Sequence, residues 1–158
     1  METRQHHVLY IEDHDDTREL VTLVLAERNY RVTTGSTIAE ALKLAREHHF
    51  DLYMLDSWLP DGSGIDLCKR LCEFDPDIPI LFLSGDAYDA DKETAMNSGA
   101  QGYLIKPADP DVLCSEVSKL IGKFPRKREA VEAPASTSNA RGSSGEIGSL
   151  ELSLPVTA

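Results

Sequence analysis

Cysteine is scarce in this sequence. The 158 residues include three cysteines, an odd number that does not make a disulfide framework. Cys68 and Cys72 lie one helical turn apart and lack the C-x-x-C spacing of a structural zinc site. We therefore predict three reduced thiols in a cytoplasmic protein.

Long apolar runs are absent as well. No run approaches the roughly 20 residues that cross a bilayer, and residues 1–7 are polar. The sequence therefore predicts neither a membrane span nor a signal peptide.

Positive charge is the third scarcity. The chain has 16 Lys and Arg residues against 27 Asp and Glu residues, a net charge of −11, and the whole excess lies in residues 1–124. A domain this acidic does not suit direct contact with nucleic acid, which needs basic surface. It suits a cation or a basic partner.

Residues 1–124 alternate short apolar runs with amphipathic segments. The apolar runs have the length of strands and lie at 8–11, 31–34, 52–55, 79–83 and 102–105. Segments with helical spacing begin near residues 15, 37, 65, 87 and 109. Regular alternation with short connections predicts an α/β fold, a five-stranded doubly wound parallel sheet with helices on both faces.

The composition changes at Pro125. Residues 125–158 are rich in Ala, Ser, Gly and Pro and offer almost nothing to bury, which predicts a disordered tail and no output domain. The alternating apolar residues of 150–156 are either a random tail end or a segment that adds a strand to a partner's sheet.

The stretch from Leu52 to Gly64 is the centre of the domain. Four apolar residues run into Asp56, which suits a strand buried on both faces of a parallel sheet. The carboxyl ends of such strands are where open α/β sheets bind ligands. Pro60 and the glycines at 62 and 64 then fix a tight loop. This stretch alone leaves open whether Asp56 is functional or merely ends a strand.

Polar side chains follow four of the five predicted strands: Glu12 and Asp13, then Asp56, Ser84 and Lys106. In one parallel sheet these strand ends lie at the same edge, so the side chains can converge. Two carboxylates about 4 Å apart repel by roughly 4 kcal/mol at an effective dielectric constant near 20. Mg²⁺, which prefers hard oxygen ligands, would relieve that repulsion.

The same side chains suit phosphoryl transfer. A magnesium ion and the Lys106 ammonium can neutralise charge on a transferring phosphoryl group. The Ser84 hydroxyl can donate a hydrogen bond to a phosphoryl oxygen. The Asp56 carboxylate can attack phosphorus and form an aspartyl phosphate.

This pattern resembles the receiver domain of two-component response regulators. The resemblance covers about residues 6–123 and rests on Glu12-Asp13, Asp56 with Pro60 and Gly64 behind it, Ser84-Gly85, and the phrase from Gly99 to Pro107. It implies the flavodoxin-like strand order 2-1-3-4-5.

The resemblance also implies a role for each residue at the strand ends. Asp56 would accept a phosphoryl group from a phosphohistidine on a sensor histidine kinase or a histidine phosphotransfer protein. Asp13, Asp56 and the backbone carbonyl of Trp58 would bind Mg²⁺, with Glu12 acting through water. Ser84 and Lys106 would contact the phosphoryl group.

By the same resemblance, the peptide between Lys106 and Pro107 would be cis, and Tyr103 would turn inward when Ser84 moves toward the phosphate. The protein would then be a stand-alone phospho-switch or phosphorelay carrier. It would not be a turnover enzyme, because it would only phosphorylate itself and slowly lose the group. A downstream protein would contact the face formed by the fourth helix, the fifth strand and the fifth helix.

Two residues depart from the commonest receiver pattern. Trp58, two residues after Asp56, is bulky, and Asp86, two residues after Ser84, is acidic. We predict that Asp86 disfavours anionic phosphodonors, whereas Trp58 could shield the phosphate from water; the sequence leaves open which effect dominates.

Three functions are alternatives to phosphoryl acceptance. A phosphatase of the haloacid dehalogenase type needs a D-x-D run after its first strand, and an FMN-binding flavodoxin needs a Ser/Thr/Gly-rich loop there; residues 12–16 provide neither. The remaining alternative is a receiver-like binding scaffold that is never phosphorylated. The sequence leaves open the cognate kinase, the downstream target and whether phosphorylation drives formation of a homodimer.

Overall fold

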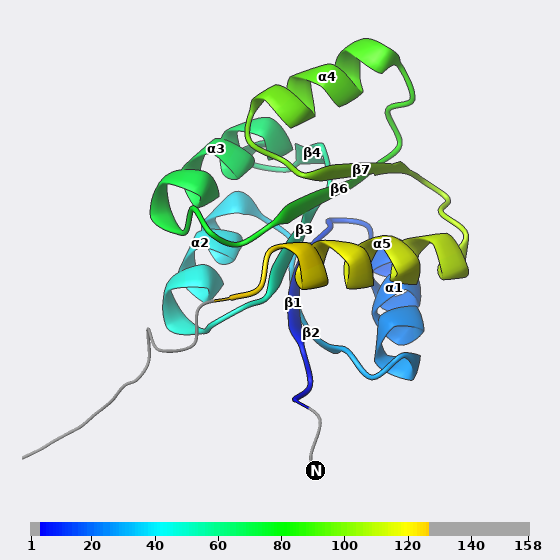
Figure 1. Ribbon diagram of the computed structural model, residues 1–158. Helices are drawn as coiled ribbons and strands as arrows, with labels where there is room; N and C mark the ends of the chain where they lie inside the picture. Colours follow the sequence, from blue (N-terminus) through cyan, green and yellow to red (C-terminus); the bar gives the residue numbers. More distant parts are fainter. Residues whose placement is uncertain (1–3, 127–158) are drawn as a thin grey trace, which may run out of the picture. The chain divides into compact units, whose positions relative to one another are not determined.

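A computed structural model describes residues 4–126 (Figure 1). The helices and strands all belong to one compact unit that ends at Pro125. The predictions for residues 127–158, a disordered tail without an output domain and a docking segment near its end, lie outside the described residues. None of the helices in residues 4–126 is long and apolar enough to cross a membrane.

The main sheet has five parallel strands in the order β2-β1-β3-β6-β7. Their bounds are β1 (His7–Ile11), β2 (Arg31–Gly35), β3 (Leu52–Leu55), β6 (Ile80–Ser84) and β7 (Gly102–Ile105). Counted along the chain, this is the predicted order 2-1-3-4-5, so the fold prediction is confirmed. The central strands β1, β3 and β6 are buried along their whole length, as their unbroken apolar sequences require.

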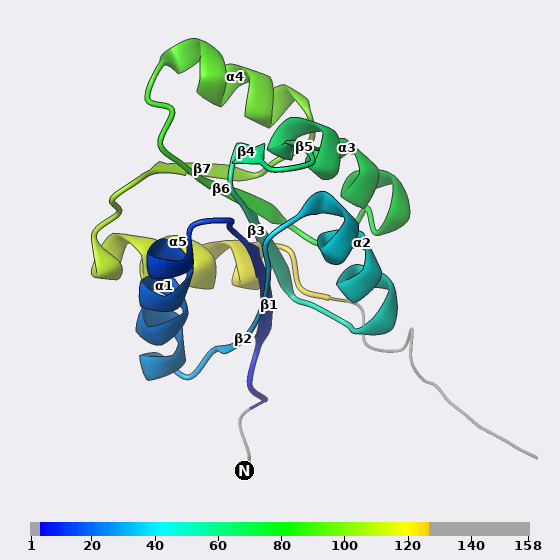
Figure 2. The ribbon, with the colours of Figure 1, turned by 180° about the vertical axis from the view of Figure 1, so that it is seen from behind.

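Five helices cover the sheet: α1 (Asp15–Glu27), α2 (Ile38–Glu47), α3 (Gly64–Phe74), α4 (Asp89–Asn97) and α5 (Pro110–Lys123). Helices α1 and α5 lie on one face and α2, α3 and α4 on the other, as Figures 1 and 2 show from opposite sides. Strand residues alternate between the two cores. In β1, Val8 and Tyr10 pack with α1 and α5, whereas Leu9 and Ile11 pack on the opposite face.

A short hairpin follows the central strand and was not predicted from the sequence. Strands β4 (Trp58–Leu59) and β5 (Gly62–Ser63) pair antiparallel between β3 and α3. The Asp61 carboxylate in its turn accepts hydrogen bonds from the backbone N–H groups of Ile38 (2.8 Å) and Ala39 (3.1 Å). The turn is therefore fixed to the start of α2, where unpaired N–H groups favour an anion.

At the other end of this hairpin, Gly64 contacts Ser57, the residue directly before β4. Its N–H donates to the carbonyl of Ser57 at 2.7 Å. A Cβ atom at position 64 would lie 2.0 Å from the backbone carbonyl oxygen of Asp56. Only glycine permits this close approach of the two backbone segments. The position of Asp56 thus depends on a glycine eight residues later in the chain.

We predict that Gly64→Ala lowers the free energy of unfolding by about 1–3 kcal/mol, the usual cost of overpacking, because the Asp56 backbone must move. Urea denaturation followed by circular dichroism measures the change. The matched control is Gly122→Ala in α5, where nothing lies within 4 Å of the added Cβ. There alanine should stabilise the helix by about 0.5–1 kcal/mol. A Gly64→Ala protein as stable as the unmodified one would show that the close approach imposes no constraint.

Candidate functional site

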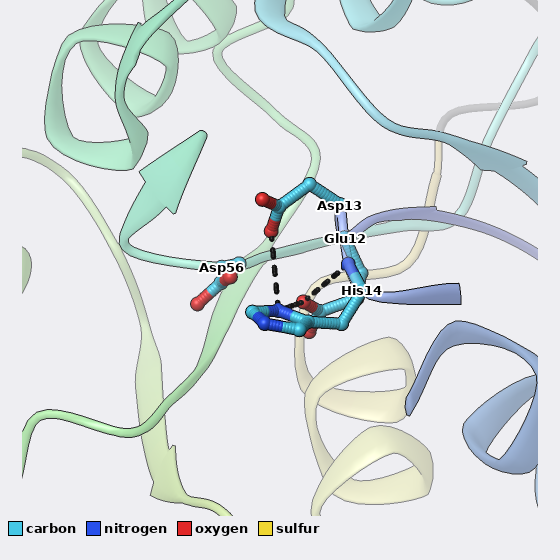
Figure 3. Close-up of side chains that lie close together, drawn as sticks. All are labelled: Glu12, Asp13, His14 and Asp56. Atoms are coloured by element: carbon cyan, nitrogen blue, oxygen red, sulfur yellow. Dashed lines mark hydrogen bonds and ion pairs between the residues drawn. The ribbon is translucent and has the colours of Figure 1, made fainter. Parts of the chain in front are cut away.

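Three carboxylates meet at the carboxyl edge of the sheet (Figure 3). Glu12 and Asp13 follow β1 and Asp56 follows β3, the strand paired beside it. Oxygen atoms of these three residues and a ring nitrogen of His14 all lie within 4.8 Å of one another. Glu12 is fully buried and Asp56 nearly so, whereas Asp13 is half-buried. The predicted convergence of these side chains is therefore present.

His14 is a member of this cluster that the sequence analysis did not single out. Its Nδ1 atom lies 3.4 Å from Glu12 Oε2 and 3.5 Å from Asp13 Oδ1 (Figure 3). Its place directly after Glu12 and Asp13 was the available signal. Its side chain is 75% exposed, so it stands at the rim of the cluster and not inside it.

Lys106 supplies the opposite charge. It follows β7, and its Nζ atom lies 2.8 Å from Glu12 Oε1 and 3.4 Å from Asp56 Oδ1. The peptide between Lys106 and Pro107 is cis, as the resemblance implied. The ammonium therefore contacts two of the three carboxylates, which still outnumber it.

The site shifts the pKa values of its two buried carboxyl groups, Glu12 and Asp56, in opposite directions. Burial alone would raise the pKa of Glu12, but the hydrogen bond and charge of Lys106 lower it, helped by the N–H of His14 and the Tyr10 hydroxyl. Burial, followed by repulsion from Glu12, raises the pKa of Asp56 to about 6, against the opposing effects of Lys106 and the Ser57 N–H. Of these two buried carboxylates, Asp56 is therefore the one that is less stabilised in its charged form.

Tyr10 holds the Glu12 side chain in place. Its side chain is fully buried, and its hydroxyl donates to Glu12 Oε1 at 3.0 Å. Burial and the neighbouring Glu12 raise the pKa of Tyr10, so the hydroxyl keeps its proton and remains a donor. A tyrosine within an apolar strand looks like an ordinary core residue, so the sequence alone does not single out Tyr10.

The residues fit a divalent cation. Carboxylate oxygens are the hard ligands that Mg²⁺ prefers, and Asp13, Asp56 and Glu12 offer them together. Among the described residues, the buried Oδ1 atom of Asp13 is without a hydrogen-bond partner. A buried carboxylate oxygen without a donor is costly unless a cation approaches it.

Asp86 joins the loop after Asp56 to the predicted switch residues. Its carboxylate accepts a hydrogen bond from Trp58 Nε1 at 2.8 Å, and its backbone carbonyl accepts one from the Tyr103 hydroxyl at 2.7 Å. Its backbone N–H donates to Ser84 Oγ at 3.0 Å. The two residues that depart from the common receiver pattern, Trp58 and Asp86, are therefore hydrogen-bonded to each other.

Tyr103 and Ser84, the predicted switch residues, lie on the neighbouring strands β7 and β6. The ring of Tyr103 is half-buried and stacks on Phe82 with a centroid separation of 6.0 Å, which directs its hydroxyl toward the loop between β6 and α4. Ser84 is the last residue of β6 and is fully buried. Its hydroxyl also accepts a hydrogen bond from the buried Ser57 at 2.7 Å, a contact that the sequence analysis did not anticipate.

Comparison with known families agrees with this geometry. The family described as "Response regulator receiver domain" matches residues 8–118. The chain belongs to this family. The match spans the strands and helices from β1 into α5 and includes every predicted site residue. As a receiver domain, the chain is a signalling module of two-component systems.

Relatives of this receiver domain include proteins about twice its length. The transcriptional regulatory protein AfsQ1 of Streptomyces coelicolor is 33% identical over 120 residues, which cover 76% of this chain and 53% of AfsQ1. The response regulator ArlR of Staphylococcus aureus is 28% identical over 120 residues, covering 76% and 54%. The chain spans about half the length of the curated relatives it matches.

Solved receiver structures superpose on nearly their whole length. The chemotaxis protein CheY4 of Vibrio cholerae has a TM-score of 0.71 and 27% identity, covering 74% of this chain and 99% of CheY4. A two-component response regulator of Clostridium difficile has a TM-score of 0.73 and 26% identity, covering 77% and 100%. The compact unit described above is therefore a whole receiver fold.

The crowding of carboxylates predicts that Asp13→Asn stabilises the metal-free receiver domain. Removing one negative charge relieves repulsion that Lys106 does not fully balance, so the free energy of unfolding should rise by about 1 kcal/mol. Urea denaturation in the presence of EDTA measures this. The control is Asp16→Asn, a change at an exposed aspartate outside the cluster, which should not raise the free energy of unfolding. An Asp13→Asn protein less stable than the unmodified one would contradict the repulsion argument.

Proposed function

We propose that Asp56 accepts a phosphoryl group from the phosphohistidine of a sensor histidine kinase or a histidine phosphotransfer protein. The observation that carries the proposal is the position of Asp56, a buried carboxylate that lies beside both the acidic pair after β1 and the Lys106 ammonium. No other described aspartate combines these two kinds of neighbour within one cluster.

The proposed transfer is a displacement at phosphorus. An oxygen of the Asp56 carboxylate forms the new O–P bond as the N–P bond of the donor breaks, and the electron pair of that bond returns to the imidazole nitrogen. The Lys106 ammonium, already 3.4 Å from Asp56 Oδ1, balances charge on the transferred oxygens. Mg²⁺, held by Asp13, Asp56 and the backbone carbonyl of Trp58 with Glu12 acting through water, would neutralise the same oxygens.

We propose that the product acts as a switch and not as an enzymatic intermediate. Ser84 would donate to the phosphoryl oxygens and Tyr103 would follow it, since both are bonded to Asp86. The group would then be lost slowly to water. The cytoplasm is the proposed compartment because Cys68, Cys72 and Cys114 are all free thiols.

Output is proposed to pass to a downstream protein through α4, β7 and α5. Each of these elements exposes a large apolar side chain: Met96 on α4, Ile105 on β7 and Val112 on α5. These side chains lie on elements that are neighbours in the fold, because α4 and α5 each contact β7. The acidic described surface does not favour nucleic acid as a direct partner.

The acceptor assignment predicts a specific effect of Asp56→Asn. With Mg²⁺ and acetyl phosphate, the unmodified protein should gain the mass of one phosphoryl group, and the fluorescence of Trp58, two residues from the acceptor, should change. Asp56→Asn should do neither, whereas Asp66→Asn, an exposed aspartate in α3, should behave as the unmodified protein. EDTA should abolish both signals. If the unmodified protein shows neither a metal response nor a mass gain, the binding-scaffold function replaces this one.

The bond between Trp58 and Asp86 predicts a long-lived phosphoryl group. The indole is 66% exposed, but its N–H is held at 2.8 Å by Asp86, so the ring stays beside the acceptor loop. Trp58→Ala should speed dephosphorylation several-fold, and Trp58→Phe, which keeps a ring without the N–H, should lie between. The half-life of the labelled protein after removal of donor is the measurement. An unchanged half-life in Trp58→Ala would remove the shielding role.

A further inference from the structure

In Ser57, the residue directly after the acceptor, the N–H, the carbonyl and the hydroxyl each make a hydrogen bond. Its N–H donates to Asp56 Oδ1 at 2.8 Å, and its carbonyl accepts from the N–H of Gly64 at 2.7 Å. Its hydroxyl donates to Ser84 Oγ at 2.7 Å. Both serines are buried. Ser57 is therefore held rigidly between the acceptor carboxylate, the start of α3 and the end of β6.

The hydrogen bond from Ser57 limits the hydrogen bonds that the Ser84 hydroxyl can still make. A serine hydroxyl has one proton to donate and two lone pairs that accept. In Ser84, the Asp86 N–H fills one lone pair and the Ser57 hydroxyl fills the other. The Ser84 hydroxyl is thus left with its proton as the only free hydrogen-bonding function. It can act toward a further group only as a donor.

The sheet register places this donor beside the acceptor. Leu55 pairs with Phe82 across β3 and β6, and the hydrogen bond between Ser57 and Ser84 continues this alignment beyond the end of β3, so Ser84 lies next to the residue that follows Asp56. Ser84 is fully buried and has no access to bulk water. The acceptor that would complete its hydrogen bonding is an oxygen attached to Asp56.

We infer that Ser57 is a positioning residue for the phosphoryl switch: by donating to Ser84 Oγ, it fixes Ser84 as a donor toward the phosphoryl oxygens on Asp56. The inference rests on the proposed function of Asp56. In a buried chain of two hydroxyls, each hydrogen bond also polarises the next, so the Ser84 donor is strengthened. Ser57 acts through Ser84 and need not touch the phosphoryl group.

The test measures the affinity of the Mg²⁺-loaded protein for beryllofluoride, a tetrahedral phosphoryl mimic whose fluorides accept hydrogen bonds. Trp58 fluorescence reports both Mg²⁺ and beryllofluoride binding. Ser57→Ala should weaken beryllofluoride binding about tenfold, as expected for loss of an oriented donor to a charged group. Mg²⁺ affinity should stay within about twofold, because no carboxylate of the cluster has been altered. Ser57→Thr, which restores the hydroxyl, should recover the affinity.

Ser63→Ala is the matched control. Its hydroxyl caps α3 by accepting from the Ile65 N–H at 2.9 Å and makes no bond to Ser84. The change should lower stability without weakening beryllofluoride binding. A loss of affinity in Ser63→Ala equal to that in Ser57→Ala would show that loop stability, and not the hydroxyl pair, controls the site.

A double-mutant cycle tests whether Ser57 acts through Ser84. In a Ser84→Ala background, Ser57→Ala should have no further effect on beryllofluoride affinity. Unchanged affinity in Ser57→Ala alone, an equal fall in Mg²⁺ affinity, or an additive loss in the double variant would each overturn the inference. If the unmodified protein binds neither beryllofluoride nor the phosphoryl group of acetyl phosphate, the proposed function has failed and not this inference alone.

Discussion

Repulsion among buried carboxylates is the constraint on which the site depends. Glu12, Asp13 and Asp56 have oxygen atoms within 4.8 Å of one another, and the Lys106 ammonium contacts two of them, Glu12 and Asp56. A protein gains nothing in stability from such an arrangement without a cation. Under the proposed function, the cluster would bind an added cation. That cation would in turn balance the negative charge of a phosphoryl group.

The fold maintains this unfavourable cluster with a layer of fixed contacts around it. Tyr10 and Lys106 hold Glu12, and the close approach of Gly64 to the Asp56 carbonyl holds the acceptor. On the opposite side, Asp86 connects the acceptor loop to the end of β6 and to Tyr103. Hydrogen bonds therefore run from Asp56 through Ser57, Ser84 and Asp86 to Tyr103 on β7, and under the proposed function they would carry the effect of a change of charge at Asp56.

The fold and the edge residues were predictable because the signals are local. Four of the five apolar runs end at a polar residue, and parallel topology alone brings Asp56 and Lys106 to one edge. The β4-β5 hairpin and the bonds from Ser57 to Ser84 and from Trp58 to Asp86 were not predictable. The hairpin strands have two residues each, too short for a periodic pattern. The two hydrogen bonds join loops far apart in sequence, and the spacing of residues carries no information about which side chains meet across such loops. Trp58 and Asp86 stood out in the sequence separately, and only the structure shows that they are partners.

The most direct test of the account is chemical identification of the phosphorylated residue. The protein would be treated with Mg²⁺ and a small phosphodonor, then with borohydride, which reduces an acyl phosphate to an alcohol, and its peptides sequenced by mass spectrometry. The account predicts conversion of the aspartate at position 56 to homoserine, dependent on donor and Mg²⁺. Reduction at another carboxylate, or a phosphate that resists borohydride because it sits on serine or histidine, would contradict it.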